Sequence, residues 1–326
     1  MSEIKRIAVY TSGGDAPGMN AAIRAVYRTA NNYDLHVYGI QRGYDGMIDD
    51  DIELLQDDSV RNILQRGGTI LKSSRSERIR TKEGRQIAYD NLKARDIDAL
   101  ISIGGNGTLT GAHIFTSEFD MNVIGIPSTI DNDLYGTDFT IGFDTAVNTA
   151  VECVDKIRDT ADSHNRLFLI EVMGRDAGYI ALFTSIASGA STFIIPEKPC
   201  TLDQLITELR KSLRRKKLFG LVILAEGNQL GEPNEIAKML NKSIPEYDIR
   251  IAIIGHMQRG GSPTANDRIL AGRLGYEAVQ SLMSGQKNVM VGFINNQLTY
   301  TPFEEAIHKS KKPGDYWIKL AEGLGR

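Results

Sequence analysis

The sequence predicts an α/β fold with mainly parallel sheets. Short apolar runs alternate with stretches of helical spacing from one end of the chain to the other, and this alternation is typical of βαβ units. Glycine-rich turns follow several of the apolar runs. With 326 residues, 41% apolar and 24% charged, the chain has an ordinary globular composition. It is long enough for two packed domains or for one large α/β domain with insertions.

The elements are expected in the following order. A strand over Ile4–Tyr10 is followed by a helix from Met19 to about Asn31. The clearest later helix spans Phe143–Ile157, where apolar side chains recur on one face. The remaining strand-like runs are Leu35–Ile40, Ala99–Ile103, Met121–Ile126, Leu167–Val172, Thr192–Ile195, Leu221–Ala225, Ile249–Ile254 and Val289–Ile294. No linker marks a domain boundary.

Charge and cysteine usage exclude several classes of protein. A formal net charge of −3 argues against a general nucleic-acid binder. No apolar stretch approaches the roughly 18 residues of a membrane span, and no signal-peptide pattern opens the chain. Cys153 and Cys200 form no disulfide or metal framework. We therefore expect a cytoplasmic protein without nucleic-acid or membrane partners.

Two acids follow one of the predicted strands. Residues 125–133 read Gly-Ile-Pro-Ser-Thr-Ile-Asp-Asn-Asp, so Asp131 and Asp133 lie beyond a carboxyl end, where ligands bind in open parallel sheets. One carboxylate can accept a proton while the other helps to hold a metal. The alternative is a plain polar turn, because Asp and Asn favour turns.

Two glycine-rich loops have the position of phosphate-binding loops. Thr11–Gly18 and Gly104–Thr108 each connect a predicted strand to a predicted helix. Glycines let the backbone approach a polyphosphate, and a helix N-terminus adds N–H groups and positive dipole. Neither loop matches the Walker motif or the dinucleotide fingerprint. The steric need for glycine in a tight turn is the alternative explanation.

The second half of the chain supplies cations. Guanidinium groups bind phosphate in a bidentate manner, and Glu226 could accept hydrogen bonds from sugar hydroxyls. The candidate cationic residues, which lie at or near strand ends, are Arg166, Arg175, Arg250, His256 and Arg259. Together with the acid pair and the glycine loops, they indicate a phosphoryl transferase that acts on a phosphorylated small molecule.

Four segments closely resemble bacterial 6-phosphofructokinase, and the resemblance covers nearly the whole chain. They are Thr11–Arg24, Thr129–Asp133, Val172–Arg175 and Gly255–Pro263. The resemblance implies two similar three-layer α/β domains with a cleft between them. Residues 1–142 and 260–308 would bind the nucleotide, and residues 143–259 and 309–326 would bind fructose 6-phosphate. It also implies a homotetramer, Mg²⁺, and a glycolytic ATP-dependent 6-phosphofructokinase that forms fructose 1,6-bisphosphate and ADP.

The resemblance also assigns roles to residues. Asp131 matches the general base and Asp133 its neighbour near the metal, while Thr129 would contact the transferring phosphoryl group. Arg175 would stabilise its developing charge. The residues on the nucleotide side are Gly14, Tyr44, Arg75, Arg80, Asn106, Gly107, Thr108 and Gly111. Those on the substrate side are Thr129, Asp131, Arg166, Met173, Gly174, Arg175, Glu226, Arg250, His256 and Arg259, of which Arg166 and Arg250 resemble residues borrowed across a subunit interface.

Several positions depart from the family pattern. Asn106 stands where a magnesium-binding aspartate is usual, and an amide oxygen carries no charge for the metal. Ser128 replaces a glycine common in ATP-dependent members. Pyrophosphate-dependent relatives typically have Asp at the Gly107 position and Lys at the Ser128 position, so ATP is the expected donor. The segment Lys72–Arg80 lacks the usual glycine and aromatic residue near Arg75, so contacts to the adenine should differ.

The effector site is also expected to be altered. Basic residues matching those that bind ADP or phosphoenolpyruvate are Arg24, Arg28, Arg158, Arg215 and Lys217. Asp57, however, stands where an arginine is common, and Ser191 where a metal-binding glutamate is common. Because an anion weakens a nearby phosphate site, we expect blunted or altered regulation.

Two alternative functions stay open. One is a kinase of the same fold that uses pyrophosphate or another sugar phosphate. The other is a catalytically weak paralogue that binds the ligands and regulates a partner, an interpretation to which only Asn106 points. The Gly-Gly-Asn-Gly-Thr loop is also similar to that of NAD and lipid kinases, but those lack the arginine-rich second half.

Overall fold

The computed structural model describes residues 4–164, 166–214 and 219–325. The chain divides into two compact units. Unit 1 contains the residues up to Thr129, Leu134–Asp144 and Arg259–Lys311. Unit 2 contains Ile130–Asp133, Thr145–Gln258 and the residues from Lys312 onward.

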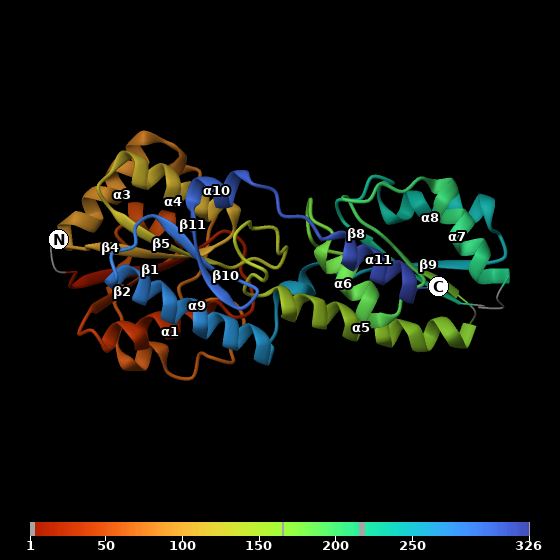
Figure 1. The fold of residues 1–326 in the computed structure, drawn as a ribbon, viewed down its shortest axis with the longest axis horizontal. Helices are drawn as coiled ribbons and strands as arrows, with labels where there is room; N and C mark the ends of the chain where they lie inside the picture. Colours follow the sequence, from red (N-terminus) through yellow and green to blue (C-terminus); the bar gives the residue numbers. More distant parts are fainter. Residues whose placement is uncertain (1–3, 165, 215–218, 326) are drawn as a thin grey trace. The chain divides into compact units, whose positions relative to one another are not determined.

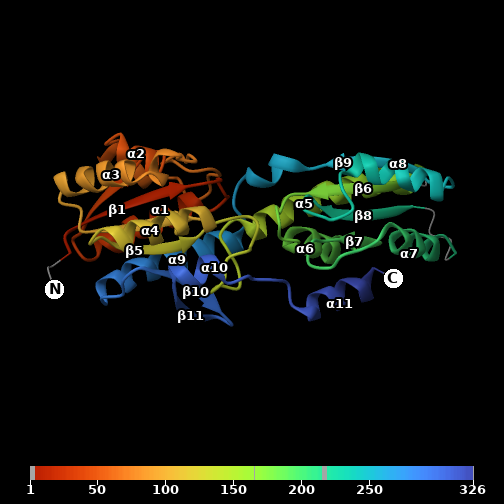
Figure 2. The ribbon, with the colours of Figure 1, turned by 90° about the horizontal axis from the view of Figure 1, so that it is seen from above.

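Unit 1 is built on a seven-stranded sheet with the order β11-β10-β5-β4-β1-β2-β3. The inner pairings are parallel, whereas β3 and β11 join antiparallel at the two edges. In Figure 2 the β10–β11 hairpin forms one edge of this sheet. The strands are β1 (Arg6–Ser12), β2 (His36–Ile40), β3 (Ile52–Leu54), β4 (Ala99–Gly104), β5 (Asn122–Pro127), β10 (Val289–Ile294) and β11 (Gln297–Pro302).

Helices cover both faces of this sheet, as Figure 1 shows. On one face lie α1 (Met19–Asn31) and α9 (Ala265–Met283), which pack against each other. The helices of the other face are α2 (Tyr44–Ile48), α3 (Lys82–Ala94), α4 (Asn106–Glu118) and α10 (Phe303–His308), with the short 3₁₀ turns η1 (Asp57–Val60) and η2 (Arg78–Arg80) in the connections. Tyr44, Phe115 and Phe303 pack into the core on this face. Burying apolar stripes on both faces of a sheet gives the three-layer arrangement.

Unit 2 contains a four-stranded parallel sheet with the order β7-β8-β6-β9. Its strands are β6 (Arg166–Val172), β7 (Thr192–Ile194), β8 (Gly220–Ala225) and β9 (Asp248–Ile253). Its helices are α5 (Phe143–His164), whose first residues belong to unit 1, α6 (Tyr179–Ser188), α7 (Leu202–Arg214), α8 (Pro233–Ser243) and α11 (Asp315–Leu324), and η3 (Gly255–Arg259) follows β9. Residues of α7 and α8 share one core cluster with β6 and β8, on the face opposite α5 and α6 (Figure 1).

The expected α/β class with mainly parallel sheets is confirmed, and each predicted strand is present within two residues of its predicted ends. The prediction missed β3 and β11, which lie at the sheet edges. Edge strands are short or polar on one side, so they lack a continuous apolar run. For β11 the sequence did contain a signal, the pair Asn295-Asn296, because Asn favours two-residue hairpin turns. Both residues have positive φ in the structure. Within the described residues no helix is long and apolar enough to span a bilayer.

Candidate active site

The glycine loops and the acid loop begin at one edge of the sheet in unit 1. Strands β1, β4 and β5 are parallel neighbours. Ser12 pairs with Gly104, and Gly104 pairs with Pro127. The three segments that follow these strands therefore start side by side at the carboxyl edge, which is where ligands bind in open α/β sheets.

Thr108 connects the two glycine loops. Its Oγ1 donates a hydrogen bond to the carbonyl oxygen of Ser12 at 3.0 Å, and the residue is buried. A Cβ atom on Gly104 would lie 2.3 Å from the same Oγ1, so only glycine fits there. The Thr108 hydroxyl thus holds the start of α4 against the end of β1.

The N-terminus of α4 is open. Gly105 precedes the helix without a side-chain cap, and Asn106 and Gly107 are exposed. Apart from its two chain neighbours and the nearby backbone of its own helix, no atom of the described residues lies within 4 Å of a Cβ built on Gly107. The side chain of Thr129 is close by, because a Cβ on Gly105 would lie 3.4 Å from the Cβ of Thr129. An uncapped N-terminus of a 13-residue helix provides amide donors and positive dipole for an anion.

Arg259 brings a cation to the first glycine loop. It belongs to unit 1, and its Nη1 donates to the carbonyl oxygen of Asp15 at 3.1 Å. A Cβ on Gly14 would lie 2.6 Å from this Nη1. Gly14 therefore leaves room for the guanidinium in its observed position, which the loop sequence alone did not indicate.

Tyr44 contacts α4 through its hydroxyl group and its ring. Its hydroxyl accepts a hydrogen bond from Tyr10 at 3.0 Å and donates to the carbonyl oxygen of Thr108 at 2.7 Å. Gly111 rests on its ring, since a Cβ there would lie 2.7 Å from the phenol oxygen. Burial raises the pKa of Tyr10 to about 12 and the pKa of Tyr44 well above its usual range. Both phenols therefore stay neutral donors at working pH.

The acid loop after β5 is largely buried. Asp131 is 4% exposed and Asn132 1% exposed, while Asp133 is half-buried. Asn132 has a φ of 53°, a left-handed conformation that Asn tolerates better than most residues. The loop is further fixed where Thr140 Oγ1 donates to the carbonyl oxygen of Thr129 at 2.6 Å. A carboxylate in a shielded, fixed position suits general-base chemistry.

In unit 2, one carboxylate holds two of the predicted arginines. Arg166 and Asp248 are partners in the β6–β9 register. Asp248 Oδ2 accepts from Arg166 Nε at 2.9 Å and from Arg250 Nη2 at 3.0 Å. The hydrogen bond from Arg166, followed by that from Arg250, lowers the pKa of Asp248 below its usual range. Asp248 lies two residues before Arg250, but no sequence pattern singled it out.

The turn after β6 is held by two side chains. Glu226 Oε1 accepts hydrogen bonds from the backbone N–H of Arg175 at 2.6 Å and, more weakly, of Gly174 at 3.4 Å. Gln258, which the sequence analysis also missed, accepts at Oε1 from Met173 N at 2.9 Å and is fully buried. These bonds fix Arg175, whose φ is 52°. His256 is exposed on η3.

Comparison with known proteins identifies the family. The phosphofructokinase family matches residues 6–282. The chain belongs to the phosphofructokinase family.

Two relatives of known function are similar over nearly their full lengths. An ATP-dependent 6-phosphofructokinase of Cytophaga hutchinsonii is 52% identical over 98% of both chains. An ATP-dependent 6-phosphofructokinase 2 of Bacteroides thetaiotaomicron is 54% identical over 96% of both chains. Among solved structures, phosphofructokinase from Saccharomyces cerevisiae superposes with a TM-score of 0.88 at 35% identity and covers 93% of this chain. This chain spans 45% of the yeast chain.

The two arginines predicted to contact the nucleotide differ in their partners. Arg75 is exposed and makes no hydrogen bond or ion pair with any residue that the structure describes. Arg80 pairs with Glu77 at 3.3 Å, and both side chains are 75% exposed. An ion pair that open to solvent contributes little to stability, so Arg80 can exchange this partner for another anion.

The predicted effector residues of this phosphofructokinase are partly engaged within the chain. On α1, Arg28 Nη1 lies 2.8 Å from Asp57 Oδ1, while Arg24 is half-buried. In unit 2, Arg158 donates to the carbonyl oxygen of Ser188. Arg215 and Lys217 lie outside the described residues. The unusual Asp57 therefore neutralises one of the cations expected to bind an anionic effector.

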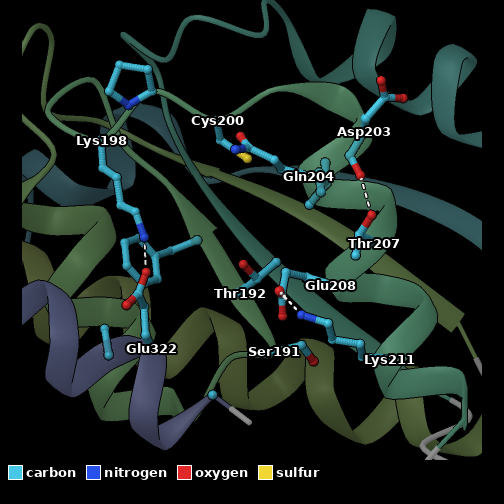
Figure 3. A pocket seen from close by; sticks show the side chains of 15 residues that line it. Ser191, Thr192, Lys198, Cys200, Asp203, Gln204, Thr207, Glu208, Lys211 and Glu322 are labelled. Carbon is cyan, nitrogen blue, oxygen red and sulfur yellow. Dashed lines mark hydrogen bonds and ion pairs between the residues drawn. The ribbon is translucent and has the colours of Figure 1, made fainter.

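Ser191 lines a pocket of about 680 Å³ in unit 2, formed by β7, α7 and α11 (Figure 3). Its Oγ accepts from Leu221 N at 3.3 Å. The pocket carries both signs of charge. Lys198 pairs with Glu322, and Lys211 pairs with Glu208 at 2.6 Å. Because each of these cations has a carboxylate partner, the pocket walls are not a purely cationic surface for phosphate.

Proposed function

We propose that this phosphofructokinase transfers the γ-phosphoryl group of ATP to the 1-hydroxyl of fructose 6-phosphate, as a cytoplasmic enzyme of glycolysis. The main support for the proposal is that this chain is similar, over nearly its whole length, to two enzymes named as ATP-dependent 6-phosphofructokinases. The open N-terminus of α4 and Arg259 beside Gly14 support it, because both favour bound phosphate.

The reaction follows from the chemistry of these groups. Asp131 accepts the proton of the 1-hydroxyl while that oxygen bonds to the γ-phosphorus. The bond between the γ-phosphorus and the β–γ bridging oxygen breaks, and ADP leaves. Thr129 contacts the transferring group and Arg175 neutralises its charge. Such a transfer depends on positioning and electrostatic stabilisation more than on covalent work by the protein.

We propose Mg²⁺ as the metal that neutralises the nucleotide phosphates. Among the described residues, no three His, Cys, Asp or Glu side chains gather to hold an ion by themselves. This donor set fits Mg²⁺, which keeps several waters and is usually bound through substrate phosphates and one or two carboxylates. Asp133 would supply a carboxylate and Asn106 an amide oxygen. Asn106 Oδ1 accepts a hydrogen bond from Thr110 Oγ1 at 3.2 Å, and from no other residue that the structure describes.

We further infer a homotetramer whose substrate sites are completed by Arg166 and Arg250 of a neighbouring subunit. The shared carboxylate of Asp248 supports this inference. It holds both guanidinium groups together on adjacent strands, so that a phosphate could bind to them as a unit. Activity would then depend on assembly.

The test of the function is the rate of fructose 1,6-bisphosphate formation with ATP and with pyrophosphate across a magnesium titration. We expect turnover with ATP that requires Mg²⁺, at a higher magnesium concentration than aspartate at position 106 would need. Restoring that carboxylate by Asn106→Asp should lower the required magnesium concentration. Turnover with pyrophosphate but not with ATP would show that pyrophosphate is the phosphoryl donor. Binding of both substrates without turnover would make the chain a regulatory paralogue.

We also predict a weak response to anionic effectors, which Asp57→Asn should strengthen. The substitution removes the charge that pairs with Arg28, leaving a net positive surface on α1. The measurement is activity at low fructose 6-phosphate during titrations of ADP and phosphoenolpyruvate. Asp58→Asn is the matched control, because Asp58 is the adjacent exposed carboxylate and pairs with Arg61 instead. Strong ADP activation of the unmodified enzyme would contradict the prediction.

A further inference from the structure

The segment Lys72–Ser76, which carries Arg75, is attached to the first glycine loop. Thr11 Oγ1 donates to the carbonyl oxygen of Lys72 at 2.6 Å. The backbone N–H of Gly13 donates to the carbonyl oxygen of Ser74 at 3.2 Å. The Gly13 amide is therefore used to hold this segment, so two hydrogen bonds join the segment to the glycine loop.

A single carboxylate holds the same segment from the other side. Asp45, in the first turn of α2, accepts at Oδ2 from Ser74 Oγ at 2.7 Å and at Oδ1 from Ser76 Oγ. Each carboxylate oxygen thus contacts one serine hydroxyl, and the Ser74 hydroxyl also lies 2.9 Å from the carbonyl oxygen of Arg42. Hydrogen bonds to an ionised acceptor are stronger than those between neutral groups, so we expect Asp45 to provide the firmest side-chain contact of this segment.

The two serines flank Arg75 in the sequence. Ser74 and Ser76 both contact Asp45, whereas Arg75 between them is exposed. The two other arginines nearby have acidic partners, since Arg78 pairs with Asp49 at 2.6 Å and Arg80 with Glu77. Arg75, by contrast, has no acidic partner among the described residues, so its guanidinium can meet an external anion without first breaking an ion pair.

We propose that Asp45 is a positioning residue for the nucleotide, which holds Ser74 and Ser76 so that Arg75 is presented to the polyphosphate beside Gly13 and Gly14. The proposal rests on the proposed function, and it goes further by assigning a role to a residue that does not touch the nucleotide. It also accounts for the absence of a glycine and an aromatic residue near Arg75, because the polar contacts to Asp45 hold the segment instead.

The test is a double-mutant cycle of Asp45→Ala and Arg75→Ala. We expect Asp45→Ala to raise KM for ATP by about tenfold, as expected for the loss of hydrogen bonds to a charged group, while KM for fructose 6-phosphate stays unchanged. The two substitutions should be non-additive, because both remove the same contact of Arg75. Additive effects, or an unchanged KM for ATP in Asp45→Ala, would overturn the proposal.

Two further variants separate positioning from folding. Ser74→Ala combined with Ser76→Ala removes both hydrogen bonds to Asp45, together with the one from Ser74 Oγ to the carbonyl oxygen of Arg42 at 2.9 Å. It should therefore raise KM for ATP at least as much as Asp45→Ala does. Asp49→Ala is the matched control, because Asp49 follows the same helix and pairs with Arg42 and Arg78. Asp49→Ala should leave KM for ATP unchanged. If it raises KM for ATP as much as Asp45→Ala does, the effect comes from general loosening of α2, and the proposal is overturned.

A binding measurement distinguishes failure of this proposal from failure of the proposed function. Calorimetric titration with Mg·ADP measures the dissociation constant of the nucleotide in the absence of turnover. If no phosphoryl transfer occurs with any donor but Asp45→Ala still weakens ADP about tenfold, the proposed function fails and the positioning role stands. If transfer is normal and ADP binds Asp45→Ala as tightly as the unmodified protein, the positioning role fails alone.

Discussion

Asp131→Ser is expected to lower kcat by roughly two to four orders of magnitude, the range for loss of a general base. Asp131 is buried on the loop after β5. Without its carboxylate, the 1-hydroxyl has no acceptor for its proton in the transition state. The measurement is steady-state kinetics with ATP and fructose 6-phosphate, together with the melting temperature.

Asp133→Asn provides the comparison for this prediction. If Asp133 acts through the metal, its variant should recover part of its activity at high magnesium concentration, because a neutral oxygen still binds Mg²⁺ weakly. Asp131→Ser should not recover in this way, since added metal does not replace a base. A kcat for Asp131→Ser within a few-fold of the unmodified enzyme would remove Asp131 from the catalytic role.

Arg175→Ala should lower kcat by about 10²–10³, the range for removing one electrostatic donor from a transition state. Both ends of its backbone are in close contact with neighbouring residues. Its N–H is bonded to Glu226, and a Cβ on Gly227 would lie 1.9 Å from its carbonyl oxygen. KM for ATP should change little, because the charge that Arg175 meets develops during the transfer.

Chemical rescue tests whether the charge is what matters. Added guanidinium ion should restore part of the activity of Arg175→Ala, whereas it should not help Asp131→Ser. Glu226→Ala serves as the positional comparison. It leaves the Arg175 side chain in place but removes the acceptor of its backbone N–H, so its loss of kcat should be smaller. A loss equal to that of Arg175→Ala, without rescue, would indicate that the whole turn had collapsed.

Much of the fold and of the candidate site could be predicted from local sequence. The strand runs and the helix at Met19–Asn31 follow from apolar spacing, and the observed bounds agree closely. The glycine loops were found because each lies between a strand pattern and a helix pattern. These features depend on residues within one turn or one strand of each other, which is the range over which periodicity and turn chemistry act.

The partners of the site residues were not predictable in the same way. Asp248 was missed because its role appears only when β6 and β9 are paired, which places it opposite Arg166. Gln258 was missed because an uncharged side chain within a motif gives no signal until Met173 is found beside it. Asp45 lies 29 residues from Ser74, and no local pattern links them.

By itself, the sequence determined the alternation of strands and helices, the placing of glycines and acids at strand ends, and the resemblance that names the chemistry. The tertiary structure alone decided that Gly14 makes room for Arg259, that Tyr44 supports α4, and that Asp57 neutralises Arg28. The reason is physical. Secondary structure and turns depend on neighbouring residues, whereas hydrogen bonds and ion pairs between distant residues exist only after packing has brought their atoms within contact.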